Sequence, residues 1–233
     1  MFSRLSLIFI LILSSAQLNA NDLSRKIKCG YALGYPPYQY VNANQQPSGT
    51  DIEMAKKVFK AAGLEVEFIA GEWEQLLSNL IHKTGKVDAL CGAEINEKRS
   101  ALVDFTEPFY FRHNTLFVLH KSPIYKIQDL YGKFVAGDRD SFFEKSLNQH
   151  KSSIRITRTA SKEESFKSLR DQKIVAAIAP EEVGHYFANS LNIRVRTIGP
   201  KDPGSPVAFA VAKGNVALKE RLNKALRKLK ANK

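Results

Sequence analysis

Residues 85–110 constrain the fold of this chain more than any other segment. A turn at Gly85 precedes a short apolar run at 87–91 and two small residues, and the pattern then predicts a helix beginning near Asn96. Arg99 falls in the first turn of that helix. The segment therefore predicts a strand, a tight loop and a helix in succession, with one guanidinium at the helix start.

Arg99 at a helix start suits an anionic small molecule. The first turn of a helix exposes unpaired backbone N–H groups and partial positive charge, and a guanidinium adds two parallel donors for a carboxylate. The alternative is a surface ion pair of Arg99 with Glu97 or Asp104. The segment by itself leaves both interpretations open.

Strands and helices alternate in the part of the chain that precedes residue 85. Residues 27–31 predict a strand, and Thr50 and Glu53 form a capping-box pattern that opens a helix ending at Gly63. A strand at 64–69 precedes a second helix, whose apolar stripe is Trp73, Leu76, Leu77 and Leu80. The order strand, helix, strand, helix, strand predicts an α/β layer with a parallel sheet covered on both faces.

A second α/β unit follows the first. Its expected elements are a crossing strand at 111–120, a core strand at 133–137, a helix at 141–147 and an apolar strand at 174–179. Ser161 and Glu164 form another capping pattern before a further helix. The helix and strand that follow repeat the pattern of the first unit, with Pro180 where the strand must end.

A series of short motifs spans nearly the whole chain beyond residue 20. It consists of YPPY at 35–38, GTDIEMAKKV at 49–58, the helix with Trp73, GKVDAL at 85–90, Arg99, VDFTEPFY at 103–110, DLYGKFVAG at 129–137 and FAVAKGN at 209–215. With these motifs, in this order, the chain resembles the family 3 extracellular solute-binding proteins. These are periplasmic receptors for amino acids and related polar solutes.

The resemblance implies an α/β, two-lobed periplasmic-binding-protein-like fold of type II. Each lobe is expected to be a mainly parallel sheet flanked by helices, and two hinge crossings join the lobes. The expected boundaries are a signal peptide at 1–20, lobe 1 at 21–111, lobe 2 at 112–206, and a return to lobe 1 with a C-terminal helix at 207–233.

A ligand cleft is expected where several predicted loops converge. In open parallel sheets, ligands bind beyond the carboxyl ends of the strands. The loops at 31–38, 92–99, 138–142 and 180–182 all occupy such positions. Binding is then expected to proceed by closure of one lobe on the other around the solute.

The resemblance also implies roles for individual residues. Arg99 takes the ligand's carboxylate, and the loop before it donates backbone groups from Gly92. Tyr35, Tyr38 and Trp73 stand where the family stacks aromatic rings against the solute. For Tyr38 and Trp73, packing in the core is the alternative.

The second lobe's ligand loop is expected at Arg139, Asp140 and Ser141, although Ser141 also suits the N-cap of the following helix. Two positions depart from the family pattern. Glu94 replaces the usual Thr or Ser, and Pro180 replaces the usual Asp that holds an ammonium group. A conventional amino-acid clamp is therefore incomplete.

Glu94 has two interpretations. With Glu181 or Glu182, it supplies the missing anion for an ammonium or polyhydroxy ligand. Alternatively, it pairs internally with Arg99 or Arg139, and the cleft accepts something other than an α-amino acid.

The N-terminus predicts export. Residues 1–20 carry an early cation, Arg4, then the apolar run LSLIFILIL and small residues up to Ala20, which is typical of a secretory signal peptide cleaved near Ala20. The apolar run is too short to span a bilayer, so we expect a periplasmic protein.

The formal net charge of +12 comes from residues spread along the chain. The final helix has the densest basic run, and its leucine stripe favours packing on the protein over docking on nucleic acid or membrane. The resemblance implies that Cys29 and Cys91 lie on neighbouring strands of the first lobe, where a disulfide and two buried thiols are both open. The five scattered His residues predict no metal site, and no cofactor is expected.

The function indicated is capture of a small polar solute, with delivery to an inner-membrane ABC-type permease by a monomeric binding protein. A sensor that presents its closed form to a receptor is an alternative. A dehydratase-like enzyme using Glu94, Asp140, Glu181 and Arg99 for acid/base chemistry is a weaker one. No nucleophile and base stand at recognisable spacing, and nucleic acid is not an expected partner.

Overall fold

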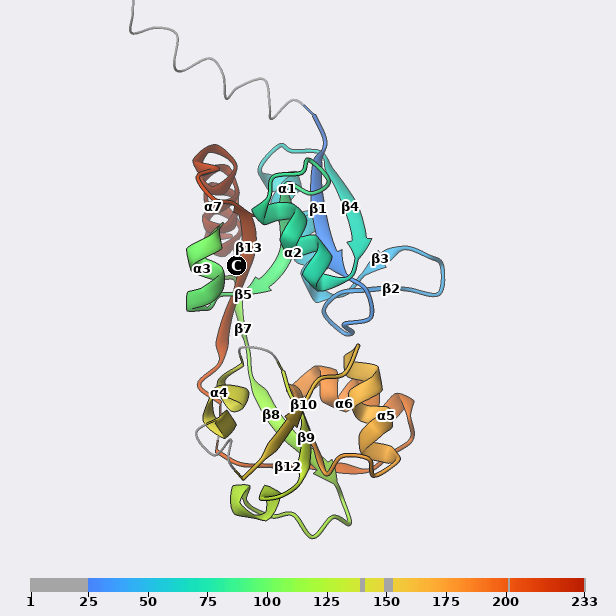
Figure 1. Cartoon of the computed structure of the whole chain (residues 1–233). Helices are drawn as coiled ribbons and strands as arrows, with labels where there is room; N and C mark the ends of the chain where they lie inside the picture. Colours follow the sequence, from blue (N-terminus) through green and yellow to red (C-terminus); the bar gives the residue numbers. More distant parts are fainter. Residues whose placement is uncertain (1–24, 139–140, 149–152, 201, 233) are drawn as a thin grey trace, which may run out of the picture.

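The computed structural model describes residues 25–138, 141–148, 153–200 and 202–232. They form two α/β lobes, one above the other in Figure 1, and each lobe contains its own sheet. The first lobe is the six-stranded sheet with helices α1, α2, α3 and α7, and the second is the five-stranded sheet with α4, α5 and α6. The predicted signal peptide lies outside the described residues.

The first sheet has the strand order β4-β1-β5-β13-β6, with β7 paired to β13. The pairs β1–β4 and β1–β5 are parallel, as predicted, whereas β13 runs antiparallel to its neighbours β5, β6 and β7. The strands are β1 (Ile27–Ala32), β4 (Val66–Gly71), β5 (Ala89–Glu94), β6 (Val103–Phe105), β7 (Tyr110–Arg112) and β13 (Ser205–Ala212). A small hairpin of β2 (Tyr40–Val41) and β3 (Pro47–Ser48) lies beside this sheet.

Helices cover both faces of the first sheet. Helices α1 (Thr50–Ala61) and α7 (Val216–Ala231) pack on one face, around Phe59, Phe209 and Leu222. Helix α2 (Trp73–Ile81) packs on the other face through Leu76 and Leu80. The short helix α3 (Glu97–Leu102) follows β5. The predicted apolar stripes therefore face the core.

The predicted capping box of Thr50 and Glu53 is wrong. Helix α1 begins after Gly49, whose φ of 117° favours glycine, and no side chain caps it. The backbone N–H groups of Thr50 and Asp51 donate instead to the carbonyl oxygens of Pro37 and Tyr38 at 3.1 Å. A Cβ at Gly49 would lie 2.1 Å from the Tyr38 oxygen, so the loop that precedes β2 closes directly on the helix start.

The second sheet has the strand order β10-β9-β11-β8-β12. The pairs β9–β10 and β9–β11 are parallel, and β8 is antiparallel to both of its neighbours. Its strands are β8 (Asn114–Leu119), β9 (Phe134–Ala136), β10 (Arg155–Thr157), β11 (Ala176–Pro180) and β12 (Val195–Ile198). The expectation of mainly parallel sheets thus holds for three strands of each lobe, whereas β13 of the first sheet and β8 of the second run antiparallel to their neighbours.

Helices cover the second sheet in the same way. Helices α5 (Lys162–Arg170) and α6 (Glu181–Ser190) pack on one face, and α4 (Phe142–Asn148) with the short η2 (Ile127–Leu130) covers the other. The predicted N-cap Ser161 is confirmed, because its side chain accepts a hydrogen bond from the Glu164 N–H.

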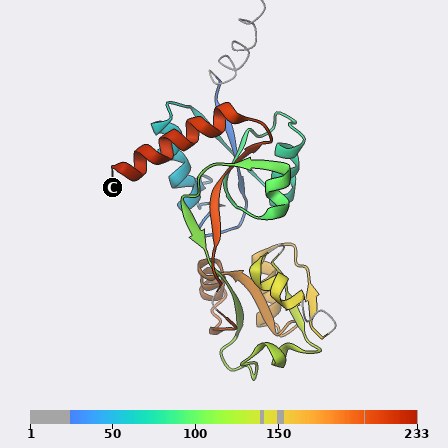
Figure 2. The ribbon, with the colours of Figure 1, turned by 90° about the vertical axis from the view of Figure 1, so that its left-hand side faces the viewer.

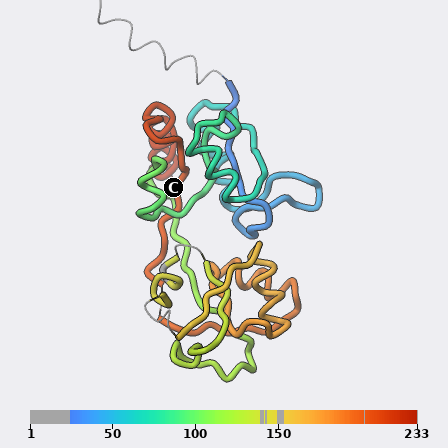
Figure 3. Tube along the Cα trace, viewed as in Figure 1, coloured from blue at the N-terminus to red at the C-terminus, as the bar shows by residue number. Residues whose placement is uncertain are grey.

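Two segments cross between the lobes. Strand β7 pairs with β13 in the first sheet, and β8 begins the second sheet only two residues later. The other crossing enters the first sheet at the start of β13, where Ser205 is opposite Arg112. Figures 2 and 3 show these segments side by side as the link between the lobes. This is the predicted pair of hinge crossings.

Cys29 of β1 and Cys91 of β5 form a disulfide, with their Cα atoms 5.5 Å apart. Both cysteines are completely buried beneath α1 and α7. The bridge joins two adjacent strands whose carboxyl ends both point toward the second lobe.

The basic C-terminal helix packs as predicted, with Leu218, Leu222 and Leu226 buried in the first core. Arg227 of its exposed face pairs with Glu107 at 2.5 Å. Within the described part of the chain, none of the helices has the length and apolar character needed to cross a bilayer.

Candidate functional site

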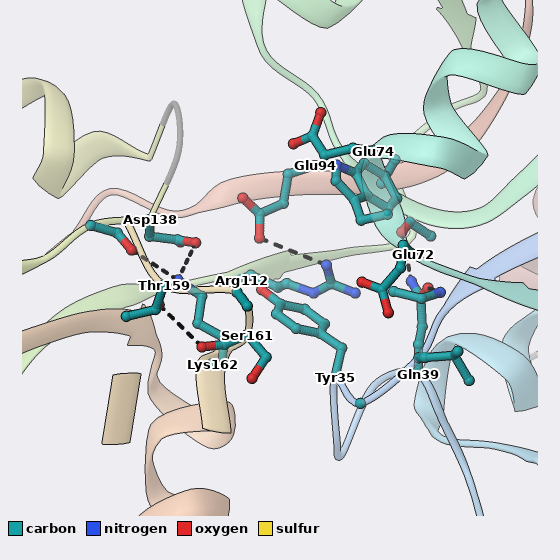
Figure 4. Close-up of a pocket in the computed structure, with 18 of the residues that line it drawn as sticks. Tyr35, Gln39, Glu72, Glu74, Glu94, Arg112, Asp138, Thr159, Ser161 and Lys162 are labelled. Carbon is teal, nitrogen blue, oxygen red and sulfur yellow. Dashed lines mark hydrogen bonds and ion pairs between the residues drawn. The ribbon is translucent and has the colours of Figure 1, made fainter. Parts of the chain in front are cut away.

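A pocket of about 370 Å³ lies between the two lobes. The first lobe contributes the loop after β1, the start of α2, the end of β5 and Arg99, and the second contributes the ends of β9 and β10 and the start of α5. Arg112 lines it from the crossing strand β7 (Figure 4). The predicted loops at 31–38, 92–99 and 138–142 each contribute lining residues, whereas 180–182 contributes none.

Arg99 lies in this pocket because of how α3 begins. The side chain of Asn96 caps the helix by accepting a hydrogen bond from the Arg99 N–H at 2.9 Å. The Arg99 guanidinium donates to the backbone oxygen of Glu94 at 2.9 Å and lies 5.1 Å from the centre of the Trp73 ring. The alternative of a surface ion pair between Arg99 and Asp104 is not realised, because Asp104 pairs with Lys213 at 3.0 Å. Arg99 is therefore held against the pocket wall by a carbonyl and an aromatic face.

A buried ion pair between Arg112 and Asp51 forms the floor of the pocket. The Arg112 side chain is 4% exposed and that of Asp51 is fully buried. Nη2 of Arg112 donates to Asp51 Oδ2, and Nε donates to the Tyr110 hydroxyl at 2.8 Å. The Arg112 guanidinium also lies 4.3 Å from the centre of the Tyr38 ring. Burial alone would lower the pKa of Arg112, but the Asp51 carboxylate and its other neighbours outweigh burial and raise it.

Both carboxylate oxygens of Asp51 accept hydrogen bonds from neighbouring side chains. It accepts hydrogen bonds from Tyr110 at 2.6 Å and from Gln39 at 2.5 Å, in addition to Arg112. Gln39 also donates to the backbone oxygen of Gly92 at 2.7 Å. A Cβ at Gly92 would lie 2.2 Å from Asp51 Oδ2, so only glycine allows β5 to approach this carboxylate. Both oxygens of the Asp51 carboxylate are therefore engaged in hydrogen bonds within the protein.

Glu94 is different, because its carboxylate makes no hydrogen bond with any residue that the structure describes. Among the described residues, the cation paired with it is Arg112, whose Nη1 lies 3.7 Å from Glu94 Oε1, beyond hydrogen-bond distance. Burial raises the pKa of Glu94, and the negative charge of Asp138 raises it further against the opposing effect of Arg112. The Glu94 side chain is only 14% exposed and points into the pocket (Figure 4).

The second lobe faces this wall with a paired cation and carboxylate. Lys162 lies 2.5 Å from Asp138 and donates to the backbone oxygen of Ile178 at 3.1 Å. Thr159 and Ser161 line the pocket beside them. Arg158 also reaches the pocket lining, and it is paired with Glu144 at 2.5 Å. In the described part of the chain, no group of three or more His, Cys, Asp or Glu side chains could hold a metal ion.

Comparison with known proteins agrees with this architecture. Residues 27–233 match the family model of the bacterial extracellular solute-binding proteins, family 3. The chain belongs to this family. This solute-binding protein is 29% identical over 232 residues to the ABC transporter arginine-binding protein 1 of Escherichia coli strain K12, covering 97% of this chain and 93% of that relative.

Solved structures give the same relationship. An ancestral arginine-binding protein bound to glutamine matches with a TM-score of 0.79 at 27% identity, covering 89% of this chain and 92% of that one. A histidine kinase sensor domain with similarity to periplasmic binding proteins matches with a TM-score of 0.82 at 26% identity, covering 91% and 92%.

Among the residues predicted to bind ligand, the pocket of this solute-binding protein is lined by Tyr35, Trp73, Gly92, Glu94 and Arg99. Tyr38 lies outside the pocket lining. It stacks on Tyr110 with ring centres 5.7 Å apart, packs in the core of the second lobe, and donates to Glu182 at 2.5 Å. Tyr38 is thus a packing contact between the lobes.

The four other predicted residues lie outside the pocket lining or outside the described residues. Ser141 does not line the pocket, and its hydroxyl caps α4 by accepting from the Glu144 N–H at 3.1 Å. Glu181 is exposed on α6, with a carboxylate oxygen 4.0 Å from His185, and it does not line the pocket either. Arg139 and Asp140 lie outside the described residues.

Sequence analysis missed Arg112, Gln39 and Lys162, which line the pocket, and it did not single out Asp138 within the predicted loop at 138–142. Two signals could have found some of them. Arg112 is a charged residue within a strand that has to be buried where the lobes meet. Lys162 is the first residue of α5, where the helix dipole disfavours a cation, so its position requires another reason.

Proposed function

We propose that this protein binds a small polar solute, an amino acid or a related carboxylate-bearing molecule, in the pocket between its lobes. The observation that carries the proposal is the pocket lined from both lobes at a two-segment hinge, with the Arg99 guanidinium in its wall. Solute capture then proceeds by closure of the lobes, with Arg99 taking the carboxylate.

The names of its relatives support this assignment. The similar Escherichia coli protein is an ABC transporter arginine-binding protein, and a similar protein of Salmonella typhimurium is a histidine-binding periplasmic protein. We therefore extend the proposal to delivery of the bound solute to an ABC-type permease. The protein acts in the periplasm as a monomer, after its signal peptide is removed near Ala20.

The test is a thermal-shift screen of amino acids, polyamines, organic acids and sugars, followed by calorimetry on each hit. A solute at 100 times its dissociation constant adds about 2.7 kcal/mol of stability, which corresponds to about 5–10 °C in a protein of this size. Arg99→Ala leaves a desolvated carboxylate unpaired, so affinity for a carboxylate-bearing hit should fall by about 2–5 kcal/mol. Arg170→Ala, at an exposed ion pair outside the pocket lining, is the matched control.

Two outcomes decide against the proposal. If no solute in the screen shifts the unfolding temperature, the pocket is not a site for small polar solutes. If a hit binds Arg99→Ala as tightly as it binds the wild-type protein, Arg99 does not hold the solute.

A sensor without transport is the second candidate, favoured by the similarity to a histidine kinase sensor domain. Uptake of labelled solute into vesicles that carry the candidate permease separates the two functions. Transport requires that uptake depends on this protein, and a sensor does not. We propose no catalytic role, and recovery of each bound solute unchanged after prolonged incubation is the corresponding check.

A further inference from the structure

The carboxylate of Glu94 is a largely buried group in the pocket, and it has no hydrogen-bonding partner among the residues that the structure describes. Its side chain is 14% exposed, and none of the described residues donates a hydrogen bond to it. Among the described residues, its one ion-pair contact is Arg112 at 3.7 Å. That guanidinium is already committed through Nη2 to Asp51 and through Nε to Tyr110. An ionised carboxylate has room for about four hydrogen bonds, so Glu94 keeps unused acceptor capacity that faces the pocket.

The pocket lining as a whole is acidic once the internal pairs are considered. Two of its cations, Arg112 and Arg158, are paired with Asp51 and Glu144, buried carboxylates that do not line the pocket. Leaving Glu74 aside, the remaining charged side chains of the lining are the carboxylates Glu72, Glu94 and Asp138 and the cations Arg99 and Lys162. The carboxylates therefore outnumber the cations that are left, and the pocket attracts positive charge.

Glu94 and Asp138 bring this negative charge together from opposite lobes. Glu94 ends β5 of the first sheet, and Asp138 follows β9 of the second. The two side chains lie on facing sides of the pocket (Figure 4). Their mutual repulsion contributes to the raised pKa of Glu94. A cation between them would relieve that repulsion and draw the two lobes together. The rings of Tyr35 and Trp73 line the same pocket and offer faces that favour a cation.

We propose that Glu94, with Asp138 opposite, forms a subsite for a positively charged nitrogen of the solute and selects solutes of net positive charge. This inference rests on the proposed function and identifies the class of solute. Arg99 binds the carboxylate of that solute, and an ammonium or guanidinium group lies between Glu94 and Asp138. An uncharged group of the same shape leaves the Glu94 carboxylate buried without a partner, so it is rejected.

Arginine and citrulline form a suitable pair of probes, because they have nearly the same shape and differ in the charge of the terminal group. Calorimetry on the wild-type protein should show arginine binding about 10- to 100-fold more tightly than citrulline, the range expected for hydrogen bonds to a charged group. Glutamate, with an added negative charge, should bind more weakly than citrulline. Glu94→Gln keeps the size of the side chain and should reduce the preference for arginine to about threefold or less.

Further variants separate charge selection from a structural effect. Asp138→Asn should reduce the preference in the same direction but by less, since Lys162 already partly neutralises Asp138. Ser141→Ala, which changes a helix cap outside the pocket lining, should leave the preference unchanged. The affinity for citrulline in Glu94→Gln should equal or exceed its wild-type value, which a merely misfolded site would not give.

The outcomes also separate this inference from the proposed function. Equal affinity for arginine and citrulline in the wild-type protein, with both lost in Arg99→Ala, would overturn the inference and leave the proposed function standing. An equal loss of both ligands in Glu94→Gln would likewise overturn it, since Glu94 would then only support the site. Binding of neither probe, together with an empty solute screen, would overturn both.

Discussion

The buried pair of Arg112 and Asp51 gives the sharpest stability prediction. Asp51→Asn keeps the shape of the side chain but removes the charge that balances a guanidinium that is 4% exposed. Breaking a buried pair from one side costs about 3–5 kcal/mol. Glu94, 3.7 Å from the same guanidinium, can compensate in part, so we expect the lower end of that range.

The assay is thermal unfolding of the ligand-free protein followed by circular dichroism. A loss of about 3 kcal/mol corresponds to a fall of about 6–12 °C in a chain of this length. Asp171→Asn is the matched control, since it breaks an exposed pair with Arg170, and exposed ion pairs contribute little to stability. Adding Arg112→Met to Asp51→Asn should recover part of the loss, because the uncompensated buried cation is then gone.

An unfolding temperature of Asp51→Asn within about 2 °C of the wild-type value would refute this reasoning. It would mean that the floor of the pocket is hydrated or loosely held in solution, and that it cannot act as the rigid base against which the solute is bound.

Three further predictions concern the bridge, the contact between the lobes, and pH. Replacing Cys29 and Cys91 together by Ala should lower the free energy of unfolding by about 2–5 kcal/mol, and thiol titration of the unfolded wild-type protein should find no free thiol. Tyr38→Phe removes the hydroxyl that donates to Glu182 at 2.5 Å across the lobes, and it should cost about 1 kcal/mol in urea unfolding, less than the loss in Asp51→Asn. Because burial raises the pKa of Glu94, its charge is lost at a higher pH than that of an ordinary Glu. Arginine affinity should therefore weaken as pH is lowered toward that raised pKa, and the variant Glu94→Gln should lack this dependence in calorimetric titrations.

The pattern of elements was predictable because it depends on local chemistry. Asn96 before a helix, Ser161 before α5 and the apolar stripe of α2 each determine a short segment without information from elsewhere in the chain. The capping box at Thr50 failed for the opposite reason. The carbonyl groups of the loop at 37–38 bind the N–H groups at the start of α1, and sequence spacing does not reveal that contact.

The site was only partly predictable, since it is assembled from segments far apart in the chain. Arg99 and Glu94 were found because they belong to one strand–loop–helix segment. Arg112 was missed because its partner Asp51 lies 61 residues away, on another element. Tyr38 belongs to the predicted loop at 31–38, but its ring packs in the core of the second lobe and not in the pocket lining, and only the folded arrangement decides between these two positions.

Small-angle scattering with and without a solute that binds tests the central claim most directly. The account predicts that the radius of gyration falls when the solute saturates the protein, because two lobes joined by β7 and β13 close around it. In Arg99→Ala at the same solute concentration, the radius should stay at its solute-free value. Identical scattering curves for the free and saturated wild-type protein would contradict the claim that closure of the lobes captures the solute.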